Sequence, residues 1–235
     1  MQPKLVVIEK TTKNSLIDYN NPNQLNSVMK CVITSDVVNS TKISAEKRDI
    51  LLSVLQRIEN DLQTICVTNI EVYRGDSFQV LVEDASKGML CAILIRAGLM
   101  CFAPEEDKWD ARLSLGIGDV QYENRRVTMS DGEAFRLSGR TFEEIGKRRL
   151  VVTTISEDIN EELTLSCAFA DDIISGWSKK QAQLMYQVLL KGTPRKELAD
   201  LHSTSVQNIG KKLRAAKENL VVLFLRRFEL LIKKL

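Results

Sequence analysis

The hydrophobic positions of this chain follow one pattern up to residue 156 and another beyond it. Between residues 31 and 156, short apolar runs alternate with stretches in which apolar residues recur every three or four positions. Short runs between turn-forming residues predict buried strands, whereas the longer period predicts helices with one buried face. Beyond residue 156 only the helical period remains. The chain therefore divides into a mixed part followed by a helical part.

The mixed part has the order strand, helix, strand, strand, helix, strand, helix, strand. Gly75 and Asp76 separate the second and third strands, which predicts a tight hairpin. This order is a βαββαβ core with a further helix and strand, so we expect an α+β fold of the ferredoxin-like class. The predicted strands are 31–36, 70–74, 77–82, 111–118 and 149–155, and the predicted helices are 44–65, 86–102 and 131–145.

The helical part predicts four short helices without a strand, at 177–190, 193–201, 203–213 and 218–235. One side of the last helix is apolar. That side either covers the core of the helices before it or pairs with a second copy of the chain, and the sequence leaves both open. The expected organisation is an N-terminal arm at 1–30, a ferredoxin-like domain at 31–156, and a linker helix with a helical domain at 157–235.

The net charge also divides the chain, at Trp177. The whole sequence carries a formal charge of only +2. Residues 1–177 hold 20 Lys and Arg against 27 Asp and Glu, a net of −7, whereas residues 178–235 hold 13 against 4, a net of +9. An acidic body with a basic tail predicts a polyanionic partner for the tail.

Composition indicates a soluble cytoplasmic protein. The N-terminal apolar stretch is too short for a signal peptide, and the most apolar window, 88–102, contains Arg96 and is too short for a membrane span. The five cysteines show no metal-ligand spacing and are expected to be buried free thiols. With His202 as the single histidine, a histidine-based metal site or a Ser-His-Asp triad is not expected.

Two aspartates stand where a metal site would need them. Asp36 ends the first predicted strand, and Asp76 lies at the tip of the predicted hairpin. The first and third strands are neighbours in a ferredoxin-like sheet, so the two carboxylates could converge. Carboxylates suit a hard cation such as Mg²⁺ that shares its other ligands with water and phosphate. The alternative is that both aspartates only cap turns.

The residues around both aspartates resemble class III nucleotidyl cyclases. The segment Ser35–Thr41 is similar to the family's Asp-Ile-x-x-Ser/Phe-Thr signature, and Arg74–Phe78 resembles its Gly-Asp hairpin. The resemblance implies that Asp36 and Asp76 hold Mg²⁺ or Mn²⁺ together with a nucleotide.

A third segment, Gly132–Arg140, is similar to the cyclase helix that carries an Asn and an Arg. The resemblance implies that Arg140 stabilises the transition state. Arg136 stands where the family has the ribose-orienting Asn.

A closer resemblance is to the SatD family of small bacterial proteins. The family's successive motifs are Ile-Thr-Gly-Asp-Ile-Val-Asn-Ser-Arg-Lys, Gly-Asp-Glu-Phe-Gln, Arg-x-Gly-Ile-Gly and Asp-Gly-Pro-Ala-Phe. They are matched in order by Ile33–Lys42, Gly75–Gln79, Arg112–Gly118 and Asp131–Phe135. This resemblance implies a nucleotide-binding or metal-binding cleft and does not specify a reaction.

The basic tail resembles the helix-turn-helix of sigma region 4 and of response-regulator type (LuxR-like) proteins. In the segment 203–213, apolar positions face the preceding helix and polar positions face away. Amide side chains near the start of a recognition helix suit base edges, and later Lys and Arg suit phosphates. The alternative is a basic helical bundle that packs on the body. The predicted DNA contacts are Ser205, Gln207, Asn208, Lys211, Lys212 and Arg214.

The sequence therefore predicts a DNA-binding transcriptional regulator whose first domain senses a nucleotide or a metal-nucleotide. We expect double-stranded DNA as partner, no membrane, and a homodimer that reads paired half-sites. A metal-dependent nucleotidyl cyclase or transferase with a helix-turn-helix targeting module is the alternative. A ligand-free dimerisation scaffold is a third possibility.

Overall fold

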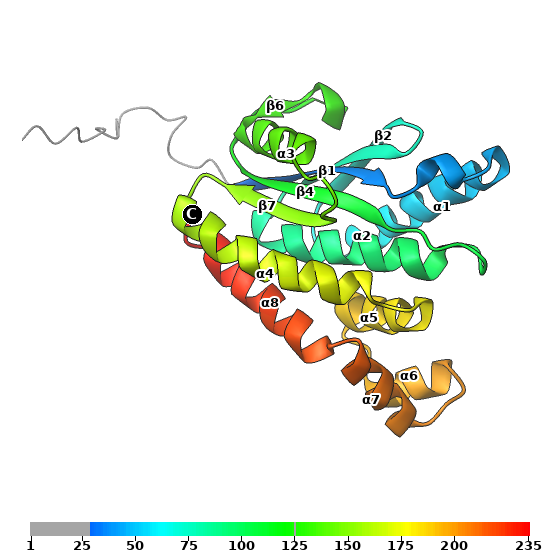
Figure 1. Cartoon of the computed structure of the whole chain (residues 1–235). Helices are drawn as coiled ribbons and strands as arrows, with labels where there is room; N and C mark the ends of the chain where they lie inside the picture. The colour runs from blue at the N-terminus through cyan, green and yellow to red at the C-terminus, as the bar shows by residue number, and fades with distance from the viewer. Residues whose placement is uncertain (1–28, 125) are drawn as a thin grey trace, which may run out of the picture.

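The computed structural model describes residues 29–124 and 126–235, and contains a central five-stranded sheet. The predicted N-terminal arm, 1–30, lies almost wholly outside the described residues. Along the sheet the order is β2-β3-β1-β4-β7 (Figure 1). The strands are β1 Lys30–Val37, β2 Thr68–Arg74, β3 Ser77–Val82, β4 Ala111–Gly118 and β7 Leu150–Thr154. A second, two-stranded sheet pairs β5, Val120–Tyr122, with β6, Asp131–Gly132.

The sheet is mixed in direction. Strand β1 is antiparallel to both of its neighbours, β3 and β4, and β2 is antiparallel to β3. Strand β7 is parallel to β4, and α3 connects the two segments of chain. The α+β class predicted from the alternating periods is confirmed. The small β5–β6 sheet was not predicted, because its segment has a charged loop composition.

Eight helices are present in the described residues. They are α1 Ala45–Leu62, α2 Gly88–Phe102, α3 Glu133–Glu143, α4 Glu157–Ser175, α5 Lys179–Lys191, α6 Arg195–Leu201, α7 Val206–Ala215 and α8 Glu218–Ile232. Short 3₁₀ turns occur at Ser40–Lys42, Ala85–Lys87 and Val127–Met129. Most predicted helices are confirmed, with ends displaced by a few residues, as expected where only caps and fraying fix a boundary.

Helices cover both faces of the sheet (Figure 1). The alternation of β1 sends Cys31 and Ile33 into the large core beneath α1 and α2. It sends Val32 to the opposite face, where Val32 packs with Ala134 of α3. Helix α3 approaches β4 so closely that a Cβ at Gly116 would lie 2.2 Å from the carbonyl oxygen of Ala134. Glycine at this position is therefore required by the packing.

Helix α2 lies at the centre of the fold and is the most apolar helix. The segment Ala85–Phe102 is long and apolar enough to cross a membrane, but 78% of it is buried inside the fold. Arg96 lies near its middle with a side chain that is 0% exposed. These features are those of a buried core helix.

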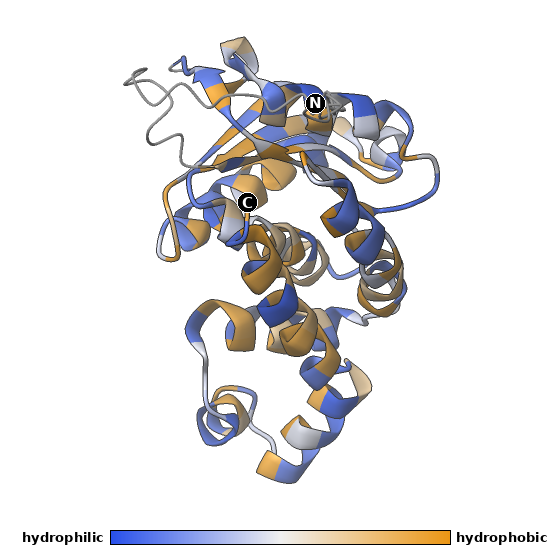
Figure 2. Ribbon diagram, turned by 90° about the vertical axis from the view of Figure 1, so that its left-hand side faces the viewer, coloured by the Kyte–Doolittle hydropathy of each residue, from blue (hydrophilic) through white to orange (hydrophobic). Residues whose placement is uncertain are grey.

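The hydrophobic core continues from the sheet into the C-terminal helices. Helix α5 packs along α2, and the Tyr186 ring contacts the Phe102 ring edge-on with centroids 5.1 Å apart. The Tyr186 hydroxyl donates a 2.8 Å hydrogen bond to Asp61 of α1. Figure 2 shows the hydrophobic residues gathered between the sheet and these helices. The predicted division at residue 157 therefore falls inside a continuous core.

Helix α4, predicted only as a linker helix, packs against β7, α2 and α8. Ile159, Leu163, Cys167, Ala170 and Ile174 bury its inner side. Helices α6 and α7 extend away from the sheet at the far end of the molecule (Figure 1).

The cysteines are all free, as predicted, but Cys66 is only partly buried.

Candidate functional site

The main chains of the two predicted metal ligands are adjacent. Asp36 pairs in register with Ser77, and the Val37 amide donates a 2.9 Å hydrogen bond to the carbonyl oxygen of Asp76. Their carboxylates, however, have different partners. Both oxygens of Asp36 accept hydrogen bonds from Arg112, from Nε at 2.9 Å and from Nη2. One oxygen of Asp76 accepts a hydrogen bond from the Ser40 hydroxyl.

The Asp36–Arg112 pair follows from the register of the sheet. Asp36 lies directly opposite Arg112 across the β1–β4 ladder, so the two side chains stand on the same face. The bidentate hydrogen bond to Asp36 raises the pKa of Arg112 above its ordinary value. From the sequence, Arg112 is only the first residue of a strand motif, and it is not a predicted site residue. A strand register, which the sequence does not reveal, is what brings it to Asp36.

A cleft of about 580 Å³ opens beside this ion pair. Lys147 and Arg149, which both precede β7, line it together with Arg112. Lys147 has no hydrogen bond or ion pair among the described residues. Three cations therefore line the cleft against one carboxylate, and that carboxylate is already paired with Arg112. The lining residues are Asp36, Val37, Val38, Asn39, Ser40, Thr41, Arg112, Lys147 and Arg149.

The loop after β1 adds backbone donors to the cleft. Asn39 has left-handed backbone angles, φ 57° and ψ 32°, and a right-handed 3₁₀ turn begins at Ser40. A left-handed residue followed by a right-handed one turns successive amide groups toward one concavity, which attracts anions. The amides of Asn39, Ser40 and Thr41 make no hydrogen bond within the part of the chain that the structure describes. The cleft thus offers N–H donors and cations, the complement of a phosphate group.

The same arrangement does not fit the predicted Mg²⁺ or Mn²⁺ site. A cation at Asp36 would share the carboxylate with the Arg112 guanidinium, which hydrogen-bonds both oxygens and whose positive charge opposes a second cation. Arg112, Lys147 and Arg149 would also repel it. Within the described residues no cluster of three or more acidic, histidine or cysteine side chains suits a metal. Binding of a cation between Asp36 and Asp76 would require Arg112 to move.

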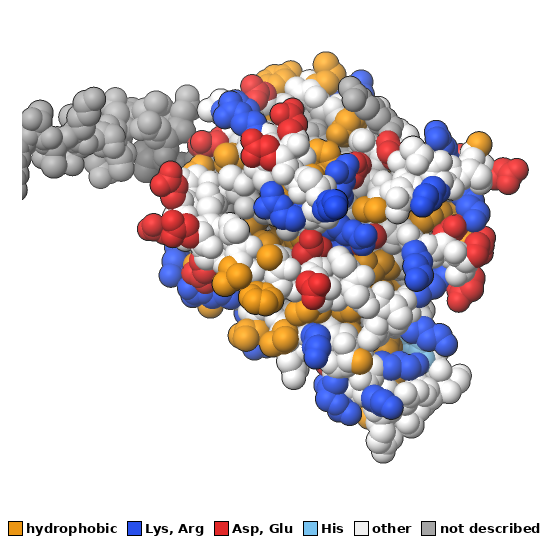
Figure 3. Space-filling model, viewed as in Figure 1, with side chains coloured by type: hydrophobic (Ala, Val, Ile, Leu, Met, Phe, Trp, Pro, Cys, Tyr) orange, Lys and Arg blue, Asp and Glu red, His pale blue; other side chains and the backbone are white. Residues whose placement is uncertain are grey.

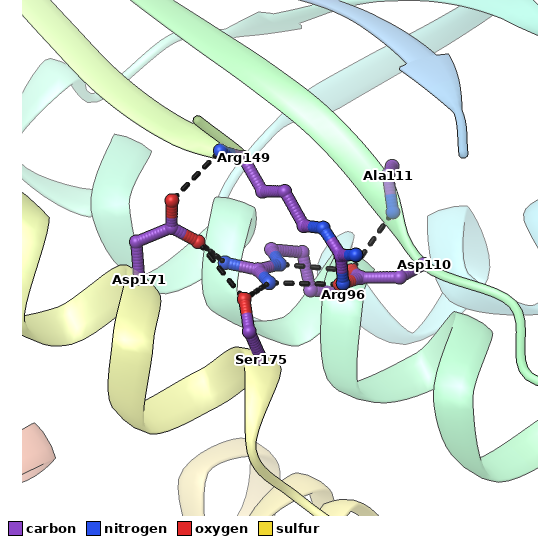
Figure 4. A network of polar contacts seen from close by, with 6 residues as sticks. All are labelled: Arg96, Asp110, Ala111, Arg149, Asp171 and Ser175. Atoms are coloured by element: carbon purple, nitrogen blue, oxygen red, sulfur yellow. Dashed lines mark hydrogen bonds and ion pairs between the residues drawn. The ribbon is translucent and has the colours of Figure 1, made fainter. Parts of the chain in front are cut away.

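A buried charge network fixes Arg149 in the wall of the cleft (Figure 4). Arg149 Nη1 donates a 2.8 Å hydrogen bond to Asp110, and the Arg149 amide donates a 2.7 Å hydrogen bond to Asp171 of α4. Arg96 binds both aspartates, at 2.8 Å to Asp110 and 2.7 Å to Asp171. Burial alone would lower the pKa of Arg96, but the hydrogen bonds and charges of Asp110 and Asp171 outweigh it and raise that pKa.

Arg140, the predicted catalytic residue, is not among the lining residues of the cleft. It lies exposed on α3, without a hydrogen bond or ion pair to any described residue. Arg136, on the same helix, pairs with Asp131 at 3.1 Å. The structure therefore brings Asp36 and Asp76 together along the backbone, whereas Arg140 makes no hydrogen bond or ion pair with either of them.

The predicted DNA contacts lie on α7 and at its cap. Ile209 and Leu213 are buried toward the neighbouring helices, whereas Val206, predicted to be apolar packing, is 43% exposed. The exposed side chains include Gln207, Lys211 and Arg214. Figure 3 shows Lys and Arg side chains gathered toward this end of the molecule.

The other three predicted contacts are partly engaged. The Ser205 hydroxyl caps α7 by accepting from the Asn208 amide at 3.1 Å. The Asn208 side chain donates a 2.8 Å hydrogen bond to the Thr204 hydroxyl. Lys212 is partly buried. Ser205 and Asn208 thus shape the start of α7, which leaves Gln207, Lys211 and Arg214 as its most accessible polar face.

His202, in the turn before α7, is partly buried and hydrogen-bonds through Nε2 to the Gln187 side chain at 2.8 Å. Burial, and then the charge of Lys212, lower its pKa. His202 therefore ties the turn before α7 to α5.

Comparison with known proteins adds no assignment to these sites: no family model matches the chain, and no curated protein matches it.

Proposed function

We propose that this chain is a cytoplasmic DNA-binding regulator that reads duplex DNA with α7. The supporting observation is that α7 has two different sides. Ile209 and Leu213 form a buried apolar side, and the exposed polar side carries Gln207, Lys211 and Arg214. Helix α6 packs against α7, and α5 and α8 flank the pair. We assign these helices to a helix-turn-helix, in which the second helix of the pair enters the major groove.

A mobility shift with the full chain tests this function. Lys211→Ala should weaken binding to all duplexes by a similar factor, because a lysine at this point meets phosphates. Gln207→Ala should instead change the preference between sequences, because an amide reads base edges. Lys108→Ala, at an exposed lysine in the loop before β4, is the matched control. It should change neither the affinity nor the preference between sequences. Absence of binding to any duplex at low salt would exclude the proposal.

For the sheet, we propose a ferredoxin-like domain that carries the ligand cleft. The order β2-β3-β1-β4 with three antiparallel pairings supports that class. The resemblance to SatD proteins and class III cyclases is consistent with a nucleotide as the ligand. The cations and free loop amides favour recognition through the phosphates of that nucleotide, without a metal.

Ligand binding is tested by the shift in unfolding temperature with nucleoside triphosphates, in the presence of a chelator. A ligand that binds only the folded chain raises the midpoint, and the shift grows with the logarithm of the ligand concentration once that exceeds Kd. Lys147→Ala should abolish most of the shift while leaving the unliganded midpoint unchanged, because exposed Lys147 makes no hydrogen bond or ion pair with any described residue. Lys180→Ala is the control at an exposed lysine outside the cleft. No shift in the wild-type chain would exclude the ligand.

The metal-dependent cyclase is the second candidate, favoured by the adjacent main chains of Asp36 and Asp76. The arrangement supports it less well, because Arg112 holds both oxygens of Asp36. Incubation with each nucleoside triphosphate and Mg²⁺ or Mn²⁺ decides between the candidates. A cyclic or linear product that is lost in Asp36→Ala would favour the cyclase.

A further inference from the structure

Five large hydrophobic side chains are exposed together on the outer sides of α4 and α8. They form what we call the α4/α8 face, and each is more than half exposed: Leu165 63%, Phe169 65%, Leu220 53%, Leu223 63% and Leu230 58%. Figure 3 shows hydrophobic side chains gathered over these two helices. Contiguous apolar surface of this kind marks an interaction site, because scattered single residues are the norm elsewhere on a monomer.

The two helices form one surface because an ion pair joins them. Arg227 of α8 binds Glu162 of α4 through two hydrogen bonds of 2.6 and 2.8 Å. Leu165 and Phe169 lie three and seven positions after Glu162, and Leu223 and Leu230 lie four before and three after Arg227. Residues at these spacings share one side of a helix, so the leucines and the phenylalanine flank the ion pair.

The two helices of this face differ in charge. Helix α4 contains no Lys or Arg. Asp171 and Asp172 lie near its end, and its other four acidic residues lie near its start: Glu157, Asp158, Glu161 and Glu162. Basic residues lie in the second half of α8 and just after it: Arg226, Arg227, Lys233 and Lys234. The pKa of Glu162 is lowered first by Arg227 and also by Lys234, which places the start of α4 beside the end of α8. The helices are therefore antiparallel, as Figure 1 shows.

We infer that the α4/α8 face binds a second copy of this chain. A two-fold axis along the helices lays α4 of each copy on α8 of the other and keeps the acidic start of α4 opposite the basic end of α8. The other face-to-face arrangement, with α4 on α4 and α8 on α8, needs an axis perpendicular to the helices. It sets the acidic start of α4 opposite the far end of the second α4, and α4 contains no Lys or Arg to pair with it. Charge complementarity thus selects the first arrangement, an antiparallel four-helix bundle with the five hydrophobic residues at its centre.

This dimer has a consequence that rests on the proposed function. Helix α7 ends at Ala215, just before α8 begins, so α7 lies at the end of the bundle opposite the charged one. An axis along the helices brings both copies of α7 to that same end. Two recognition helices on one side of a dimer suit paired half-sites in DNA.

The mass of the full chain in solution tests the interface without DNA, so its outcome is independent of DNA binding. Light scattering after size exclusion should give twice the 26.6 kDa chain mass at micromolar concentration. Phe169→Glu together with Leu223→Glu should weaken the dimer at least tenfold, because four charges would enter an apolar seam. Leu52→Glu, at an exposed leucine of α1, is the control and should leave the mass unchanged. Circular dichroism confirms that each variant is folded.

Charge reversal tests the arrangement itself. Asp158→Lys alone and Lys234→Glu alone should each weaken the dimer several-fold, because each sets like charges opposite one another twice. An equimolar mixture of the two variants should restore the wild-type affinity, since both contacts then join opposite charges. A wild-type chain that stays monomeric would overturn the inference and leave the face to a different protein. Reversals that leave the affinity unchanged would also overturn it.

Discussion

At the scale of single residues, the largest departure from the sequence prediction is the pairing of Asp36. The sequence marked Asp36 as a turn aspartate suited to a cation, and the structure places it against Arg112. The cations that define the cleft, Arg112, Lys147 and Arg149, come from segments more than seventy residues beyond Asp36. No local pattern connects residues that far apart, so only the fold could reveal that these cations line one cleft with Asp36.

Arg96 is the residue on which the wall of the cleft depends most. Arg96→Met should destabilise the fold by about 3–5 kcal/mol, because it leaves Asp110 and Asp171 buried without their main partner. Urea unfolding measures the free energy. Arg140→Met, at an exposed and unpaired arginine, should change it by less than about 0.5 kcal/mol. Equal effects of the two substitutions would contradict the role of the network.

The lowered pKa of His202 predicts that the stability of the fold depends on pH. Because this pKa is lowered in the fold, the neutral form of His202 is favoured there. The stability that this contributes is present above the unfolded pKa, about 6.5, and is lost as pH falls through the folded value. His202→Gln retains a donor for Gln187 and should reduce the fall in unfolding temperature between neutral pH and about pH 5.5. An identical fall in wild type and variant would show that His202 stays solvated.

At the scale of elements, periodicity predicted where most helices and strands lie along the chain. It predicted less well which other elements each of them packs against. The strand at 111–118 was predicted with its observed ends, because turn residues bound its apolar run on both sides. Helix α4 was expected as a linker, since its composition does not show that Ile159, Leu163 and Ile174 would meet β7 and α2. The segment of β5 and β6 was missed because two or three residues are too few to show alternation.

The contact between α3 and the sheet makes a specific prediction. Gly116→Ala should destabilise the fold by about 1–3 kcal/mol or more, because the new Cβ would lie 2.4 Å from the Ser138 amide nitrogen and closer still to Ala134. Gly139→Ala, within α3, meets nothing within 4 Å and should stabilise by about 0.5–1 kcal/mol. Urea unfolding of both variants checks the pair. Two effects of the same sign would contradict the close packing of α3 on β4.

At the scale of the whole molecule, the sheet and the C-terminal helices share one core. Trp109 and Trp177, which lie near the sheet and at the start of the tail, are both buried in it. A shared core predicts that tryptophan fluorescence and far-ultraviolet circular dichroism report a single, coincident unfolding transition. Two separated transitions would instead indicate that the tail unfolds by itself.

The packing of the whole molecule also shows which charges of the basic tail are already paired. The basic tail is not uniformly free, because Arg195 pairs with Glu218 and Arg227 pairs with Glu162. The cations of α7 remain exposed at the end of the molecule away from the sheet. The sequence could assign a positive charge to the tail, but only the packing shows which cations are available to a polyanion.

The salt dependence of DNA affinity tests the central claim, that α7 binds duplex DNA, most directly. Fluorescence anisotropy of a labelled duplex with the full chain should show log affinity falling linearly with log salt. The double variant Lys211→Ala, Arg214→Ala should reduce that slope by about two, because each cation releases counterions from about one phosphate. A wild-type chain that binds no duplex at low salt, or a slope that the double variant leaves unchanged, would contradict the claim.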